Sequence, residues 1–322
     1  MDSDDQFERV VTQSFDKLRI DYWLKKKFPD TSYITICKLL RKGSIRVNGV
    51  RVKNTKIIKT NDIIKIPRYL INSSHIKDKK KIPDVLKSKI RSWVTFLNDD
   101  FIILNKPSGI PVQGGTKIKY SLDDLLSIFE HDNKIKPKLV HRIDKDTSGL
   151  LIVSRNLKSA QFFTKLFKER EILKTYLAIV NGKLIHKHGI INFPIKTKNK
   201  NLDAKTFFKR IHTYDNFSFI ALRPKTGRKN QIRKHLLQLN LPILGEKKFV
   251  VNRNLQNFDK NQNLNLHAYK VSFRDMNGKF WEFKSTITKQ MKDNLRKMNF
   301  DFMQLEQDFF LNAKNWKNIN EI

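Results

Sequence analysis

The sequence is poor in cysteine, because Cys37 is the one cysteine among 322 residues. A single thiol excludes an intramolecular disulfide and a cysteine zinc site, and it suits a reducing compartment. No uninterrupted apolar run reaches transmembrane length. The acidic start, residues 1–5, is unlike a signal peptide or a mitochondrial presequence. Acidic residues and histidines do not group at metal-ligand spacing. We therefore expect a cytoplasmic protein with no membrane segment and no bound metal.

Acidic residues are also few beside the basic ones. The chain has 31 Asp and Glu against 65 Lys and Arg, which gives a net charge of +34. Such an excess predicts a polyanionic partner, and a nucleic acid before an anionic membrane. Lys, Ile and Asn are all abundant, as an AT-rich genome produces, so part of the lysine content reflects composition. The charge supports nucleic-acid binding without establishing it.

The length suggests two domains, and residues 16–67 are predicted to form the first. A helix is expected from Arg19, a second helix ends at Gly43, and Asn48-Gly49 is a hairpin turn signal. This order resembles the S4-like RNA-binding domain. A solvated charged face is the alternative explanation for its basic residues, which otherwise suit phosphate contacts. These residues are Lys38, Arg41, Lys42, Arg46, Arg51 and Lys53.

A larger domain is predicted over 91–300, after a polar linker at 68–90 that orders only on RNA. Strands are expected at 94–97, 101–104, 172–180 and 217–222, with a helix at 158–170 and another after the last of these strands. Many strands with few helices among them indicate an α+β domain. The tail, 301–322, mixes polar and aromatic residues and supports no assignment.

The most informative segment is 141–150, which reads HRIDKDTSGL. It places one carboxylate, Asp144, between a His-Arg pair and a small Thr-Ser-Gly turn, with apolar segments on both sides. An acid held by a basic neighbour on a tight turn can present a charged nucleophile without fully burying it. Ordinary turn chemistry is the alternative, since short polar side chains bond their own backbone.

This segment resembles the central motif of the RluA-type RNA pseudouridine synthases, HRLDxxTSG. Each further match is weak alone, but five matches in the family order make a specific signal. The other four are LNKPSG at 104–109, KTYLA at 174–178, TGRKNQIRKH at 226–235 and LHA at 266–268. The resemblance implies a mixed, largely antiparallel sheet with helices around it and an RNA cleft across it. It also implies uridine isomerisation without a cofactor.

By the resemblance, the catalytic residues correspond to Asp144, Tyr176 and Arg233. The reaction breaks the bond from uracil nitrogen to ribose, rotates the base and joins it through carbon. A carboxylate can stabilise the positive charge at the sugar carbon or bond to it. It must be ionised, and Arg233 is the implied cation that lowers its pKa. Tyr176 would pack on the flipped base and help to remove the proton from carbon.

Each of these assignments has a plainer alternative. Arg233 could be an ordinary helix-surface charge, and Tyr176 could be a core tyrosine. Asp146 is variable in the motif and is interpreted as a surface residue. The resemblance further implies that Arg142 enters the space left by the flipped base or contacts phosphate. The other implied RNA contacts of this domain are His141, Lys106, Lys174 and Arg228.

Four positions in three places depart from the family pattern. Asn230 stands where histidine is usual, Glu246 where aspartate is usual, and Phe249-Val250 where tyrosine-glycine is usual. We expect these departures to alter fine details of RNA contacts and to leave the catalytic positions untouched.

The strings RKGSIRVN at 41–48 and VQGG at 112–115 most resemble the RluC-like branch. That branch implies uridines of large-subunit ribosomal RNA near the peptidyl-transferase centre, in free RNA or in a pre-ribosomal particle. We expect a monomer. The alternatives are a non-catalytic RNA-binding or ribosome-assembly protein and a synthase acting on tRNA. A DNA-binding protein is disfavoured, since no major-groove module is recognisable.

Overall fold

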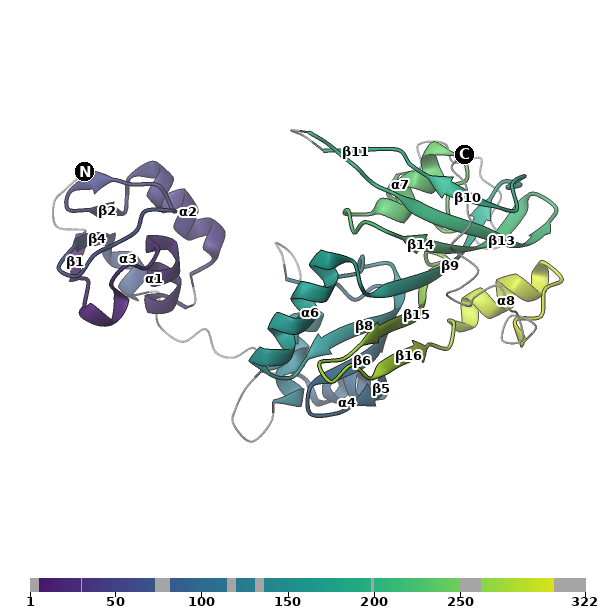
Figure 1. The fold of residues 1–322 in the computed structure, drawn as a ribbon, viewed down its shortest axis with the longest axis horizontal. Coiled ribbons are helices and arrows are strands. Elements are labelled where there is room, and N and C mark those ends of the chain that lie inside the picture. The colour runs from purple at the N-terminus through teal and green to yellow at the C-terminus, as the bar shows by residue number, and fades with distance from the viewer. Residues whose placement is uncertain are drawn as a thin grey trace. The chain divides into compact units, whose positions relative to one another are not determined.

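The computed structural model divides the chain into two compact units, Met1–Ile82 and Pro83–Ile322, which are described separately (Figure 1). None of the helices in the described parts of the chain combines the length and apolar character of a membrane span. The structure describes residues 6–29, 31–72, 82–114, 120–130, 136–197, 200–249 and 262–303.

The first unit packs two helices and a short final helix against a four-stranded sheet. The strand order is β1-β4-β2-β3, and all of the recorded pairs are antiparallel. Its core is apolar and centres on Trp23 and Ile20. The elements are β1 (Gln6–Val10), the 3-10 turn η2 (Gln13–Phe15), α1 (Ile20–Lys27), α2 (Tyr33–Lys42), β2 (Arg46–Val47), β3 (Val50–Arg51), β4 (Ile63–Pro67) and α3 (Arg68–Asn72).

The predicted order of two helices and a hairpin is confirmed, and local chemistry explains it. Ser32 caps α2, because its hydroxyl accepts the backbone N–H of Thr35 at 3.0 Å. Gly43 ends α2 in the left-handed conformation, at φ 74°, where glycine is favoured. The predicted start at residue 16 is wrong. β1 lies before it and pairs along its full length with β4.

The predicted linker, 68–90, is too long. α3 occupies its start and α4 (Asp84–Ser92) its end, and among the described side chains Leu70 of α3 and Ile90 of α4 are buried and apolar. An occasional buried residue in a polar segment gives too weak a period to be recognised from sequence.

Residues 73–81 lie outside the described residues, as does most of the predicted tail. Phe302, which is described, packs its ring on Tyr269 at a centroid distance of 5.9 Å.

The second unit is built on one large sheet, in the order β10-β13-β14-β9-β15-β8-β6-β5, with β16 on β15 and β7 on β8 (Figure 1). Its strand pairs are antiparallel except β8 with β15. The α+β class with a mixed, mostly antiparallel sheet is therefore confirmed. The strands are β5 (Val94–Leu97), β6 (Phe101–Lys106), β7 (Lys138–Leu139), β8 (Ser148–Ser154), β9 (Leu173–Asn181), β10 (His188–Ile191), β13 (Thr206–Tyr214), β14 (Phe217–Pro224), β15 (Leu266–Arg274) and β16 (Phe280–Lys284), with a separate hairpin of β11 (Ile195–Lys196) and β12 (Asn201–Leu202).

Helices cover both faces of this sheet. Successive strand residues point to opposite sides, and the apolar side chains on each side pack against helices. On β9, Leu177 belongs to the cluster that packs on α8, whereas Ala178 belongs to the cluster that packs on α7. A third cluster packs α6 on the part of the sheet formed by β6, β8 and β15. The remaining helical elements are α5 (Leu122–Leu125), η3 (Leu126–Phe129), α6 (Leu157–Glu169), α7 (Gln231–Gln238) and α8 (Lys289–Lys297).

The parallel pair of β8 and β15 holds segment 141–150 in place. Gly149 lies opposite Ala268 at positive φ, 106°, and a Cβ there would lie 2.3 Å from the Ala268 carbonyl oxygen. A buried histidine of the LHA segment, His267, joins the same strands. Its Nδ1 lies 2.8 Å from the Ser148 hydroxyl, and its Nε2 lies 2.7 Å from the Ser285 hydroxyl. Asp144 is therefore four residues before a fixed anchor.

Candidate active site

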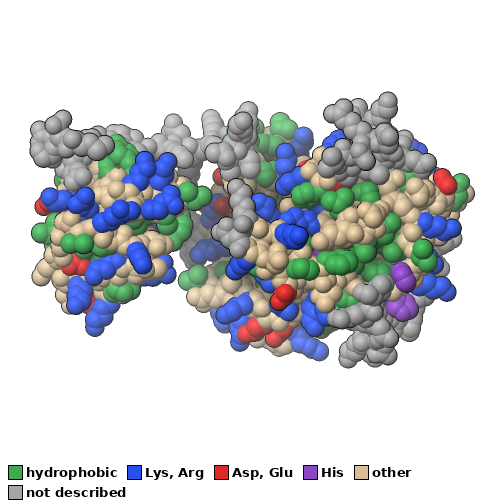
Figure 2. All heavy atoms as spheres, turned by 90° about the horizontal axis from the view of Figure 1, so that it is seen from above, with side chains coloured by type: hydrophobic (Ala, Val, Ile, Leu, Met, Phe, Trp, Pro, Cys, Tyr) green, Lys and Arg blue, Asp and Glu red, His purple; other side chains and the backbone are tan. Residues whose placement is uncertain are grey.

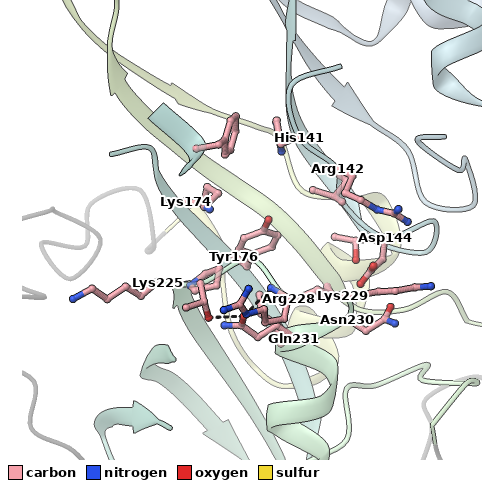
Figure 3. Close-up of a pocket in the computed structure, with 18 of the residues that line it drawn as sticks. His141, Arg142, Asp144, Lys174, Tyr176, Lys225, Arg228, Lys229, Asn230 and Gln231 are labelled. Atoms are coloured by element: carbon pink, nitrogen blue, oxygen red, sulfur yellow. Dashed lines mark hydrogen bonds between the residues drawn. The ribbon is translucent and has the colours of Figure 1, made fainter. Parts of the chain in front are cut away.

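A cavity of about 510 Å³ opens where the segment before β8, the end of α6, β9, the end of β14 and the start of α7 meet. Figure 3 shows its labelled residues around the open space. Six of the residues predicted for RNA contact or catalysis line it, whereas Arg233 and Lys106 do not. The six are His141, Arg142, Asp144, Lys174, Tyr176 and Arg228.

The Asp144 carboxylate is half-buried and faces the loop that begins α7 (Figure 3). The turn after it is closed by the Thr147 N–H, which donates to the Asp144 carbonyl at 3.2 Å. The Asn230 amide, with its nitrogen toward the carboxylate, donates to Oδ1 at 3.1 Å and to Oδ2 at 3.0 Å. This orientation satisfies both groups.

Burial raises the pKa of Asp144 above its ordinary value. Three cations, Arg233, Arg142 and Lys248, oppose the rise, and the negative charge of Asp146 adds to it. The sequence predicted a carboxyl whose pKa is lowered by Arg233, and this prediction is wrong in its net direction. The positive charge of Arg233 acts as predicted, but loss of solvent outweighs it.

Arg233 is paired with Glu246 and not with Asp144. Its Nε donates to Oε2 of Glu246 at 2.7 Å, and its Nη2 donates to Oε1 at 2.6 Å. Asp146 lies 3.4 Å from Nη1, and the guanidinium carbon lies 5.0 Å from the centre of the Phe249 ring. Bidentate geometry explains the preference, since the planar guanidinium matches a carboxylate held in the same plane. The Asp146 side chain is 46% exposed, in keeping with its interpretation as a surface residue, and it also pairs with Arg233.

Three of the departures from the family pattern lie around the two charged groups, whereas the fourth, Val250, lies outside the described residues. Asn230 contacts Asp144, while Glu246 and Phe249 contact Arg233. The expectation that these departures leave the catalytic positions untouched is therefore wrong, whereas their effect on RNA contacts stays a prediction. Sequence alone did not place them, because Glu246 lies 13 positions from Arg233 and in another element.

Tyr176 projects from β9 into the cavity, on the same face as Lys174 and Ala178, as predicted from strand alternation. Burial raises the pKa of its phenol further above the ordinary value, and the nearby charge of Asp144 adds to this. The hydroxyl therefore keeps its proton at neutral pH, which disfavours a phenolate as the base. A neutral aromatic ring on the cavity wall suits stacking with a flat base.

Lys106 is fully buried, so its predicted contact with RNA is wrong. Its ammonium donates to the carbonyls of Pro107 at 2.8 Å, Ile110 at 3.0 Å and Lys145 at 3.1 Å. Burial lowers its pKa to about 7, and the charges of Asp146 and Asp144 limit that decrease. The side chain connects two loops, of which one includes the residue after Asp144.

Replacing Lys106 with Met should destabilise the protein by about 3 kcal/mol, because three carbonyls lose their donor. Denaturant unfolding of Lys106→Met measures the loss, with Lys158→Met on the exposed face of α6 as the control. We expect the control to change the free energy of unfolding by less than about 0.5 kcal/mol. Equal effects of the two substitutions would contradict this account of Lys106.

His141 lines the cavity but is a neutral ring. Its Nε2 accepts the backbone N–H of Ile152 at 2.8 Å, and its ring stacks on Phe167 at a centroid distance of 4.3 Å. Burial, together with the charge of Lys174, lowers its pKa to about 3. An uncharged imidazole contributes no cation to phosphate binding, so the predicted RNA contact of His141 stays a prediction for a neutral ring at the cavity wall.

The rim of the cavity is basic beyond what the motifs indicated. Arg170, Lys225 and Lys229 line it although they were not predicted. Arg170 follows the last residue of α6 and has a left-handed backbone, at φ 64°. Lys225 and Lys229 flank the TGR of the motif at 226–235. Their place beside this motif is the sequence feature from which their position at the cavity could have been predicted. Among the described residues, no three His, Cys, Asp or Glu side chains group so as to hold a metal ion.

A carboxylate in a basic cavity on a mostly antiparallel sheet suits a phosphate-bearing ligand with an electron-poor centre, as an enzyme acting on a nucleotide requires. Comparison with known proteins is consistent with it: residues 100–238 match the model of the RNA pseudouridylate synthase family. The chain is 34% identical over 279 residues to ribosomal large subunit pseudouridine synthase C of Buchnera aphidicola subsp. Baizongia pistaciae, covering 82% of this chain and 88% of that protein.

The enzyme of the same name from Rickettsia conorii is 34% identical over 255 residues, covering 72% of this chain and 82% of that protein. The structure of human RNA pseudouridylate synthase domain containing 4 superimposes with a TM-score of 0.60 at 22% identity, covering 68% of this chain and 97% of that one. The chain belongs to the RNA pseudouridylate synthase family. It is an RNA pseudouridine synthase.

Proposed function

We propose that this enzyme converts uridines of large-subunit ribosomal RNA to pseudouridine, with Asp144 as the reacting carboxylate. The observation that carries the proposal is the Asp144 carboxylate itself, which faces a cavity lined by cations and by the aromatic rings of Tyr176 and Phe167. The names of the relatives, large subunit synthases, support the choice of RNA. The single free thiol, Cys37, fits action in the reducing cytoplasm.

The proposed reaction conserves all atoms. A uridine leaves its stack and enters the cavity, where its base packs on Tyr176. The bond from N1 to the sugar carbon breaks, and the Asp144 carboxylate stabilises the electron-poor carbon or bonds to it. The base then rotates, its C5 bonds to the sugar carbon, and any bond to the carboxylate breaks. C5 loses its proton and N1 gains one, so the product is an isomer of the substrate.

The cations at the cavity rim would hold the phosphates on either side of the extruded nucleotide. Arg142, Lys225 and Lys229 are exposed there, so their charges are available to RNA. Figure 2 shows that Lys and Arg side chains are frequent on the visible surface and that acidic ones are few. Such contacts determine affinity and position more than sequence preference.

We further propose that the first unit is an S4-like RNA-binding domain. Its second helix and the hairpin after it carry exposed cations beside a groove of about 780 Å³. Tyr33 and Val52 are among the residues lining the groove, so it offers apolar surface as well as charge. The exposed cations are Lys38, Arg41, Lys42, Arg46, Arg51 and Lys53.

Mapping pseudouridine in large-subunit ribosomal RNA tests the proposed function. RNA from a strain that lacks its own enzyme would be supplied with this protein or with Asp144→Ala, then labelled with carbodiimide and read by primer extension. We expect new stops with the intact protein alone. Stops in transfer RNA and none in large-subunit RNA would overturn the substrate. Stops with Asp144→Ala would overturn the role of Asp144.

A further inference from the structure

Asn230 adopts an unusual arrangement at the start of α7. It precedes Gln231 as the N-cap residue, yet its backbone is left-handed, with φ 55° and ψ 30°. An N-cap asparagine ordinarily has an extended backbone and accepts an N–H of the first helical turn. The Asn230 side chain makes no such bond. It is 8% exposed and faces the Asp144 carboxylate instead.

Asn230 is the one hydrogen-bond donor recorded for the Asp144 carboxylate among the residues that the structure describes. Its amide nitrogen lies 3.1 Å from one carboxylate oxygen and 3.0 Å from the other. Within the same described residues, Asp144 forms no ion pair. Arg233 is the partner that the sequence analysis predicted for Asp144. Its guanidinium instead donates to Glu246 through Nε and Nη2 and to Asp146 through Nη1.

We infer that Asn230 is the positioning residue that orients the Asp144 carboxylate toward the cavity, an inference that rests on the proposed role of Asp144. A neutral amide suits this purpose. It fixes the plane of the carboxylate through hydrogen bonds, but it does not neutralise the negative charge that the sugar carbon needs. The left-handed backbone is part of the arrangement, because Asn is among the few residues that adopt it readily.

Other charges also act on Asp144, so the test must separate the amide from them. The start of α7 lies beside the carboxylate, and its dipole favours the ionised form. The titratable and charged groups whose fields interact with Asp144 are Arg233, Arg142, Lys248, Asp146, Lys106 and Tyr176. All of them stay unchanged when Asn230 alone is substituted.

Asn230→Asp is the sharpest variant, because it keeps the size and backbone preference of asparagine and replaces the donor with a carboxylate. Two facing carboxylates titrate as a pair and share one proton. At neutral pH we expect the single-turnover rate to fall by roughly 100-fold or more. Toward acid pH the rate should partly recover, since the protonated introduced carboxyl donates to Asp144 again. A merely structural role would not reverse the pH profile.

Two further variants test the role of the Asn230 amide. Asn230→Gly keeps the left-handed backbone without strain and removes the amide. It should lower the rate roughly 10-fold to 100-fold, leave KM within about 3-fold, and shift the acid limb of the profile to higher pH. Asn230→His supplies a donor that also tolerates this backbone, and it should keep the rate within about 5-fold of the parent.

Asn240→Asp is the matched control, since Asn240 is also left-handed, at φ 56°, but is exposed at the other end of α7. Its pH profile should equal that of the parent. The same assay includes Asp144→Asn. If Asp144→Asn stays active, the proposed function is overturned. If it is inactive while Asn230→Asp and Asn230→Gly keep the parent profile, only the inference about Asn230 is overturned. Carboxyl NMR titration of Asp144 in Asn230→Gly gives a readout without turnover, and an unchanged Asp144 pKa would also contradict the inference.

Discussion

Asp144→Asn is expected to abolish pseudouridine formation and, at the same time, to make the protein more stable at neutral pH. The rate should fall by more than about 10⁴-fold, as for loss of a reacting group. RNA binding should stay within several-fold, because the cations around the cavity remain. Release of tritium from RNA labelled at uridine C5 measures the rate, and filter binding measures affinity.

The stability gain follows from the raised pKa of Asp144. Because the folded state binds this proton more tightly than the unfolded chain, stability decreases as pH rises from the unfolded to the folded pKa. Above that range the ionised carboxylate carries a constant cost, and asparagine removes it. The difference in Tm between Asp144→Asn and the parent should therefore be small at acid pH and larger at neutral pH.

Asp99→Asn is the control for the stability gain, since the Asp99 side chain is fully exposed. It should leave both the rate and the pH dependence of Tm as they are. A parent and an Asp144→Asn variant whose melting curves respond identically to pH would show that burial of Asp144 does not matter for stability.

Gly149→Ala is expected to cost more than about 4 kcal/mol of unfolding free energy, beyond the range of most single substitutions. The added Cβ would lie 2.3 Å from the Ala268 carbonyl oxygen and 2.6 Å from its nitrogen, so β8 and β15 would have to separate. The backbone is also strained for alanine, at φ 106°. Because these strands hold segment 141–150, activity should be lost with the fold.

Gly109→Ala separates the two causes. Gly109 has a comparable φ of 88°, but no atom lies within 4 Å of a Cβ built there. Gly109→Ala should lose only the unfolding free energy that a left-handed alanine costs, about 1–2 kcal/mol. Denaturant unfolding of the two variants side by side measures the difference. Equal losses would mean that the close approach of β8 and β15 contributes nothing.

Local patterns predicted the elements well where one residue decides the local conformation. Gly43 ended α2 as predicted, and alternation placed Tyr176 and Lys174 on the same face of β9. β1 was missed because its pairing partner, β4, lies more than fifty residues away in the chain. The parallel pairing of β8 with β15 was likewise not visible, since no local signal encodes the direction of a distant strand.

The sequence by itself determined the class of enzyme, the sheet type and the position of Asp144. Each of these depends on residue types in a fixed local order, such as HRIDKDTSGL. Only the tertiary structure decided which groups act on that carboxylate. In it Lys106 is buried and donates to three carbonyls, Arg233 pairs with Glu246, and the Asn230 amide faces Asp144. The physical reason is that burial and hydrogen-bond partners depend on atoms brought together from distant segments, and the pKa of Asp144 follows from those partners.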